Sequence, residues 1–176
     1  MSSRANQILD HAEREMRKGG PYAVSFRDIA TAIGIKSASV HYHFPTKPDL
    51  TSAVVKRYAA RFIEALGDPS DPSETPRKRL KRLVDAYIEA YEADASTCLC
   101  AVLGSVATTL PDQTQTEIAL FFKALEDWTA QAMEGGQTPY SAKLVVSLLQ
   151  GAMITTLATR DAAALEETRR LLLDEC

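Results

Sequence analysis

The sequence has few of the residues that build disulfide frameworks or metal sites, and no apolar run long enough for a bilayer span. It contains three cysteines and three histidines among 176 residues. An odd number of cysteines at these spacings predicts no disulfide framework, so we expect a reducing, cytoplasmic compartment. The uncharged, largely apolar stretch at residues 144–159 is shorter than the ~20 apolar residues of a membrane-spanning helix, and the chain opens on no apolar signal region. The sequence therefore predicts no membrane partner and a core helix at 144–159.

Patterns for catalysis and metal binding are also missing. No Gly-x-Ser-x-Gly elbow is present, and the three histidines, His11, His41 and His43, all precede residue 44. His41 and His43 are two residues apart, which places them on different faces of a helix, and His11 has no evident partner. We therefore expect no metal, no cofactor and no catalytic residues.

Charge is unevenly distributed along the chain, although the net charge is only −3. Residues 1–62 contain ten Lys or Arg against five Asp or Glu, whereas residues 63–176 contain ten against eighteen. Phosphates attract the basic part and repel the acidic part. The distribution favours a nucleic-acid partner for the N-terminal part alone.

Apolar residues recur at helical spacing throughout the chain, and no segment alternates as a strand does. The predicted fold class is therefore all-α. The last two predicted helices are joined by almost no loop and should form an antiparallel pair. We expect helices at about 4–18, 26–33, 36–44, 46–66, 76–91, 97–109, 112–134, 140–159 and 161–174.

Residues 68–75 have the composition of a linker, with two prolines and no apolar side chain. The sequence thus predicts an N-terminal helical domain at 1–48, a connecting helix at 49–67, and a second helical domain at 76–176.

Residues 25–50 have the pattern of two short helices joined at a glycine. Ser25 and Asp28 have capping-box spacing, and Gly34 stands where a helix takes a left-handed stop. The second helix has a few apolar anchors with polar side chains between them, which is typical of a helix that presents one face to DNA. The expected core positions of this segment are Ile35, Val40 and Phe44.

The same segment resembles the signature of TetR/AcrR-type transcriptional regulators. His41 is the clearest departure, because the family most often has Tyr there. The linked matches favour DNA binding over an ordinary helix-turn-helix corner in a protein of another kind. The resemblance implies a homodimeric regulator, most simply a repressor. By the same resemblance, residues 1–48 are a three-helix, helix-turn-helix DNA-binding domain, and residues 76–176 are a helical body for ligand binding and dimerisation. The matching residues are Ile29, Ala30, Gly34, Ile35, Tyr42, His43, Phe44 and Lys47.

The polar residues of this segment form the predicted DNA-binding site. Ser37, Ser39 and His41 are expected to face base edges or phosphates, while Tyr42 and Lys47 resemble the family's phosphate clamps. A second basic run, residues 77–82, is either another nucleic-acid patch or a solvated helix face, and the second interpretation is favoured. The full predicted DNA-binding set is Ser25, Arg27, Lys36, Ser37, Ser39, His41, Tyr42, His43 and Lys47.

Effector binding is expected in the body. A small molecule there would shift the protein toward a conformation whose two recognition helices no longer match the operator, which releases DNA. A helical interaction module without a ligand is an alternative if the body has no cavity. The predicted effector-binding set is Tyr87, Tyr91, Cys98, Leu103, Phe121, Phe122, Trp128 and Met153.

Cys98 and Cys100 allow more than one interpretation. Buried cysteines most often pack as small apolar residues, but a thiol in the first turn of a helix is activated by the helix dipole. Residues 98–103 also resemble a branch of the family in which some members sense electrophiles, although Val106 stands where that branch commonly has an acidic residue. A cysteine-based electrophile or redox sensor of the same fold is thus an alternative. A cysteine-dependent enzyme is disfavoured, because residues 63–176 contain no histidine to act as base.

Overall fold

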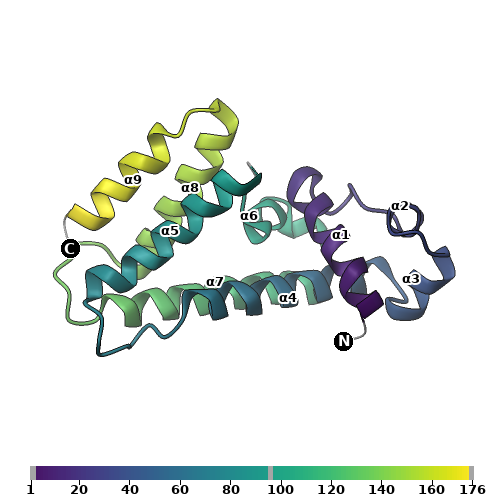
Figure 1. Cartoon of the computed structure of the whole chain (residues 1–176), viewed down its shortest axis with the longest axis horizontal. Helices are drawn as coiled ribbons and strands as arrows, with labels where there is room; N and C mark the ends of the chain where they lie inside the picture. The colour runs from purple at the N-terminus through teal and green to yellow at the C-terminus, as the bar shows by residue number, and fades with distance from the viewer. Residues whose placement is uncertain (1–2, 95–96, 175–176) are drawn as a thin grey trace. The chain divides into compact units, whose positions relative to one another are not determined.

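A computed structural model describes residues 3–94 and 97–174, and every regular element in them is helical (Figure 1). The all-α prediction is therefore confirmed. Most predicted helices agree with the observed ones to within about two or three residues at each end. The elements are α1 (Ser3–Gly19), α2 (Phe26–Ala32), α3 (Ser37–His43), α4 (Lys47–Leu66), α5 (Pro76–Asp94), α6 (Leu99–Gly104), the 3₁₀ helix η1 (Ala107–Thr109), α7 (Asp112–Met133), α8 (Ala142–Thr159) and α9 (Ala163–Asp174).

The described residues divide into two compact units, each made of separate parts of the chain. Unit 1 contains residues up to 61 together with 99–121, and unit 2 contains 62–98 and those from 122 onward. The division falls inside α4 and inside α7, so it differs from the predicted ranges 1–48, 49–67 and 76–176. Composition marks where a chain turns, whereas compactness depends on which side chains pack together.

Unit 1 is built on a fully buried apolar stripe of α1. Local capping fixes the helices that follow: the Asp28 N–H donates to Ser25 Oγ at 3.1 Å, and Thr46 and Asp49 form a reciprocal capping box. Gly34 has φ +69°, the left-handed conformation predicted for it. These local signals set the angle at which α3 leaves α2. The buried stripe of α1 contains Ile8, Leu9, Ala12 and Met16.

An ion-pair cluster joins α1 to α4 within unit 1. Glu13 is only 7% exposed, and its Oε1 lies 2.8 Å from the Arg61 guanidinium. Arg57 lies 3.4 Å from the other Glu13 oxygen and 2.7 Å from Asp10. A buried carboxylate needs such partners, because its desolvation is otherwise costly.

The segment predicted as one helix at 97–109 is instead two helical pieces, α6 and η1. Gly104 ends α6, and the Ser105 hydroxyl donates to the Val102 carbonyl at 2.7 Å. The Thr109 hydroxyl donates in the same way to Val106 at 2.8 Å. Side-chain hydroxyls that bond to nearby carbonyls compete with the helical ladder, and glycine weakens it further. The prediction was wrong here because it counted apolar spacing and neglected these competitors.

Unit 2 packs α5, α8 and α9 around a shared core. Helices α8 and α9 lie side by side as the predicted antiparallel pair (Figure 1), and Arg160 turns the chain between them with φ 58°. Inside the core, Gln150 Nε2 donates to the Tyr87 hydroxyl at 2.7 Å. The buried apolar side chains from α5 are Leu80, Leu83, Val84 and Tyr87.

Helix α8 has the length and apolar composition of a membrane span, but a core helix meets the same criterion. Seven of its side chains are buried within the protein. This agrees with the core helix predicted at 144–159. The cytoplasmic location expected from the cysteines stays a prediction.

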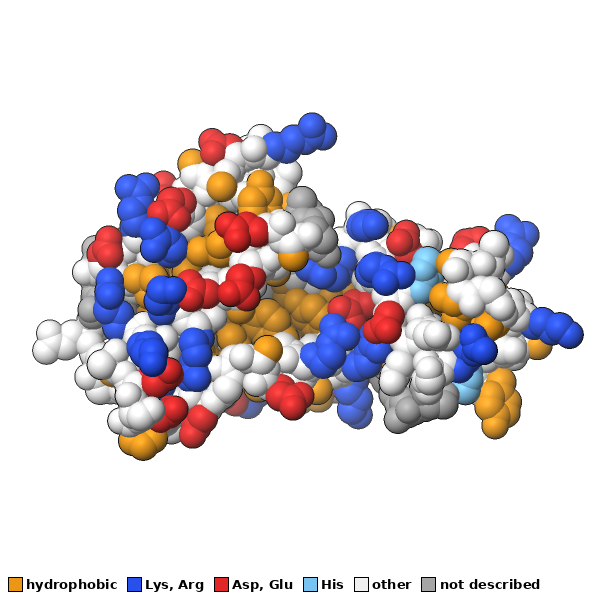
Figure 2. Space-filling model, viewed as in Figure 1, with side chains coloured by type: hydrophobic (Ala, Val, Ile, Leu, Met, Phe, Trp, Pro, Cys, Tyr) orange, Lys and Arg blue, Asp and Glu red, His pale blue; other side chains and the backbone are white. Residues whose placement is uncertain are grey.

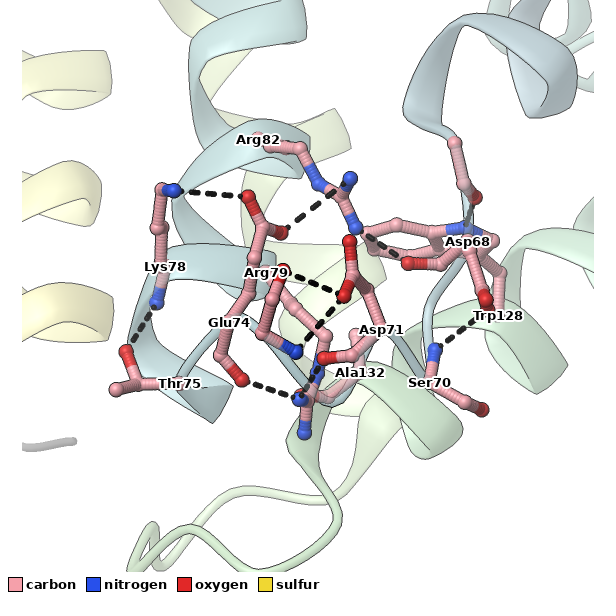
Figure 3. Close-up of polar contacts among 12 residues, drawn as sticks. Asp68, Ser70, Asp71, Glu74, Thr75, Lys78, Arg79, Arg82, Trp128 and Ala132 are labelled. Carbon is pink, nitrogen blue, oxygen red and sulfur yellow. Dashed lines mark hydrogen bonds and ion pairs between the residues drawn. The ribbon is translucent and has the colours of Figure 1, made fainter.

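A buried arginine fastens the predicted linker to the rest of unit 2 (Figure 3). Arg79 is 7% exposed, and its guanidinium donates to four backbone carbonyls instead of a carboxylate. Two acceptors belong to the linker, one to the last turn of α7, and one to Glu134 just after that helix. We call this arrangement the Arg79 clasp. Its acceptors are the carbonyls of Asp71 and Glu74 at 3.1 and 2.7 Å, and those of Ala132 and Glu134, both at 3.1 Å.

The other cations of the basic run 77–82 also have partners inside unit 2. Glu74 accepts Lys78 at 3.0 Å and Arg82 at 3.4 Å, and Arg82 also lies over the Trp128 ring. Hydrogen bonds from Ser73 to Asp71 hold the pKa of that carboxyl below its ordinary value. The favoured interpretation, a solvated helix face, is therefore wrong for Arg79 and incomplete for its neighbours. The run serves the protein's own structure.

Candidate nucleic-acid interface

An open groove of about 570 Å³ runs along the exposed face of α3 in unit 1. Ala38 and Tyr42 are four residues apart, as are Ser39 and His43, so these side chains share one face of the helix. Val40, on the opposite face, is fully buried. The groove is lined by Arg4, Gly34, Ile35, Lys36, Ala38, Ser39, Tyr42 and His43.

The groove brings together four of the nine residues predicted to bind DNA: Lys36, Ser39, Tyr42 and His43. Tyr42 is 84% exposed and its ring packs edge-on against His43, with 5.2 Å between centroids. A large aromatic ring held this far into solvent contributes little to the core, which suits a contact with another molecule. The predicted core positions Val40 and Phe44 are buried, whereas Ile35 is half-buried and lines the groove.

The other predicted residues lie outside the groove lining. Ser25 caps α2, and Arg27 is exposed on that helix. Ser37 is the first residue of α3. His41 packs edge-on against Phe26, with centroids 4.5 Å apart.

Lys47, the remaining predicted residue, opens α4. Its ammonium lies 5.6 Å from the centroid of the Tyr22 ring, and in the described chain no carboxylate pairs with it. Its charge is thus available to a phosphate.

Arg4 belongs to the groove, although the sequence prediction missed it. It lies in the first turn of α1, more than twenty residues before the helix-turn-helix segment, so spacing within that segment could not reveal it. Figure 2 shows basic side chains projecting from the α2–α3 end of unit 1, where acidic ones are fewer, whereas basic and acidic side chains intermingle over unit 2. The concentration of cations beside α3 favours a polyanionic partner.

Comparison with known proteins identifies the fold and the family. The family model for bacterial regulatory proteins of the tetR family matches residues 8–54, which contain α2, α3 and the groove apart from Arg4. The crystal structure of a TetR transcriptional regulator from Legionella pneumophila has 31% sequence identity and a TM-score of 0.90, and the alignment covers 98% of this chain and 96% of that one. The protein belongs to the TetR family.

Other TetR-family proteins match it less closely or over a shorter range. A regulator from Agrobacterium tumefaciens is 27% identical, with a TM-score of 0.90 and coverage of 98% and 96% of the two chains. The transcriptional repressor KstR2 of Mycobacterium tuberculosis is 29% identical over 92 residues, or 52% of this chain and 46% of KstR2. The alignment thus spans about half the length of this curated relative. TetR-family proteins are transcriptional regulators that bind operator DNA and small-molecule effectors and act as dimers.

The predicted effector-binding residues of this TetR-family chain are divided between the units. Leu103 and Phe121 belong to unit 1, where Phe121 packs against Tyr58 with 5.9 Å between centroids. Trp128 belongs to unit 2, and its indole N–H donates to the Gly67 carbonyl at 2.8 Å. At least these two aromatic rings therefore have structural roles. The remaining predicted members, all in unit 2, are Tyr87, Tyr91, Cys98, Phe122 and Met153.

The two cysteines that open α6 are buried. Cys98 is 3% exposed and precedes the first residue of α6, and Cys100 is fully buried within it. The helix has only six residues, so its dipole is small. These features favour packing, which is the first of the two interpretations. The third cysteine, Cys176, lies outside the described residues.

We expect both buried thiols to react slowly in the native protein. In a Cys176→Ser variant, a disulfide reagent such as DTNB should modify Cys98 and Cys100 about 100-fold more slowly in buffer than in urea, because reaction requires local opening. Cys98→Ser and Cys100→Ser variants show which thiol gives each kinetic phase of the modification. One thiol that reacts as fast in buffer as in urea would instead favour the electrophile-sensor alternative.

Proposed function

We propose that the protein is a sequence-specific DNA-binding transcriptional regulator, and specifically a repressor that a small-molecule effector releases from its operator. The observation that carries this proposal is the α3 groove, where Arg4, Lys36, Ser39 and the exposed ring of Tyr42 meet on one face. The inner face of the same helix is anchored by Val40. Such a helix can enter the major groove, where cations contact phosphates and small polar side chains reach base edges.

The proposal includes a homodimer formed through α8. An exposed row on this helix contains Leu144, at 45% exposure, and Ile154, at 49%, with the half-buried Leu148 and the bare Gly151 between them. The spacing of four, three and three residues keeps this row on one face. Apolar side chains beside a glycine permit close approach of a second helix, and two-fold pairing presents the same face from both subunits. Val145, Leu149 and Ala152 lie on the other face of the helix, where they are buried in the subunit.

The experiment is selection of duplexes from a random DNA library by the purified protein, followed by binding measurements at several salt concentrations. The selected sites should be two-fold symmetric, with half-site centres about one helical turn, or a multiple of it, apart. Lys47→Ala should reduce the salt slope of log K by about 0.9, the contribution of one phosphate contact. Ser39→Ala should instead change the preference among sequences.

Lys143→Ala is the matched control, because Lys143 is an exposed lysine of unit 2. It should leave both the slope and the preference unchanged. Failure of the wild-type protein to retain any duplex in a salt-sensitive manner would overturn the proposal.

A further inference from the structure

Tyr22 is an exposed aromatic residue of unit 1, in the connection between α1 and α2. It is 70% exposed, so the apolar core gains little from it. Its ring lies beneath the Lys47 ammonium, 5.6 Å from the centroid, within the range of a cation–π contact.

The Tyr22 hydroxyl connects this pair to a third segment. It donates a long hydrogen bond of 3.3 Å to Thr109 Oγ1, on the last residue of η1. The three segments also share an apolar notch of about 230 Å³. The notch is lined by Pro21 and Tyr22, by Lys47, Pro48 and Thr51, and by Thr109, Leu110 and Pro111.

Among the residues that the structure describes, the partner of the Lys47 ammonium is the aromatic ring of Tyr22 and not a carboxylate. A carboxylate would neutralise the ammonium and compete with phosphate, whereas an aromatic ring orients the ammonium and leaves its charge uncompensated. An unrestrained lysine loses the rotamer freedom of four torsions when it is fixed on a phosphate. A ring that already restricts the side chain reduces this loss.

We infer that Tyr22 is a positioning residue for DNA binding. Its ring holds the Lys47 ammonium ready for a backbone phosphate, and its hydroxyl anchors the ring to η1. The inference rests on the proposed function, since it assigns a role within the same interface. Sequence spacing offered no sign of it, because Tyr22, Lys47 and Thr109 are far apart in the chain.

The test is a double-mutant cycle on a duplex selected by the wild-type protein. Tyr22→Leu should weaken binding about two- to fivefold, the range expected for an exposed cation–π contact. In a Lys47→Ala background the same substitution should cause no further loss. A merely structural role for Tyr22 would weaken binding equally in both backgrounds, and that result overturns the inference, as does unchanged binding of Tyr22→Leu.

Two further variants separate the ring from the hydroxyl and from general surface effects. Tyr22→Phe keeps the ring and loses only the long hydrogen bond, so it should bind within about twofold of wild type. A loss as large as that of Tyr22→Leu would overturn the role of the ring. Leu120→Ala, at another exposed apolar position of unit 1, should bind as wild type does. Absence of any wild-type binding would instead refute the proposed function.

Discussion

A variant with glutamate in place of Gly151 is expected to be a monomer whose subunit is more stable than that of other monomeric variants. A Cβ atom at Gly151 meets no atom of the subunit within 4 Å, so the larger side chain fits without strain. Glycine inside a helix costs about 1 kcal/mol relative to alanine, and glutamate removes most of that cost. In the proposed dimer, however, the carboxylate would lie between two apolar rows and would lose its hydration.

Light scattering at micromolar concentration measures the assembly, and urea unfolding followed by circular dichroism measures the stability. Ile154→Glu should also give a monomer, but it replaces no glycine and so gains no helix propensity. The free energy of unfolding of Gly151→Glu should therefore exceed that of Ile154→Glu by about 0.5–1 kcal/mol. Gly151→Ala should remain dimeric. If the Gly151→Glu protein is still a dimer, the interface lies on another surface.

Replacing Arg79 by methionine is expected to lower the free energy of unfolding by about 3 kcal/mol, because the carbonyls of the Arg79 clasp lose a charged donor. Methionine keeps much of the aliphatic packing, so the loss reports mainly the hydrogen bonds. Replacing both partners of a buried polar contact can be neutral, but here the four acceptors belong to the backbone and cannot be replaced.

Lys81→Met is the matched control for Arg79→Met. Lys81 lies on the same helix and makes a surface ion pair with Asp85, four residues on, which is worth about 0.5 kcal/mol or less. Urea unfolding of the two variants measures both losses in the free energy of unfolding. If both losses are small and equal, the Arg79 clasp stabilises unit 2 no more than a surface ion pair does.

The features predicted correctly from sequence are those with local causes. Ser25 and Asp28 cap the helix that begins at Phe26, and Gly34 adopts its left-handed conformation two residues after that helix ends. The recognition segment could be located for the same reason, since its pattern is complete within residues 25–50.

The features that were missed depend on contacts between distant parts of the chain. Arg4 joins the groove through the docking of α1, and Arg79 donates to carbonyls more than fifty residues away, at the C-terminal end of α7 and just after it. The effector-binding set stays a prediction, because aromatic and apolar character does not show whether a side chain such as Trp128, which donates to Gly67, also faces a ligand. Periodicity reports which face of a helix is buried, but not what covers it.

The acceptors of the Arg79 clasp are carbonyl oxygens of the backbone, which every amino acid carries. A substitution at Asp71 or Ala132 therefore leaves these acceptors in place, whereas the Glu13 cluster of unit 1 depends on carboxylates that a substitution removes. The two contacts should thus differ in how much sequence change they tolerate. The Arg79 clasp makes its demand on one side chain, while the Glu13 cluster makes a demand on both sides of each ion pair.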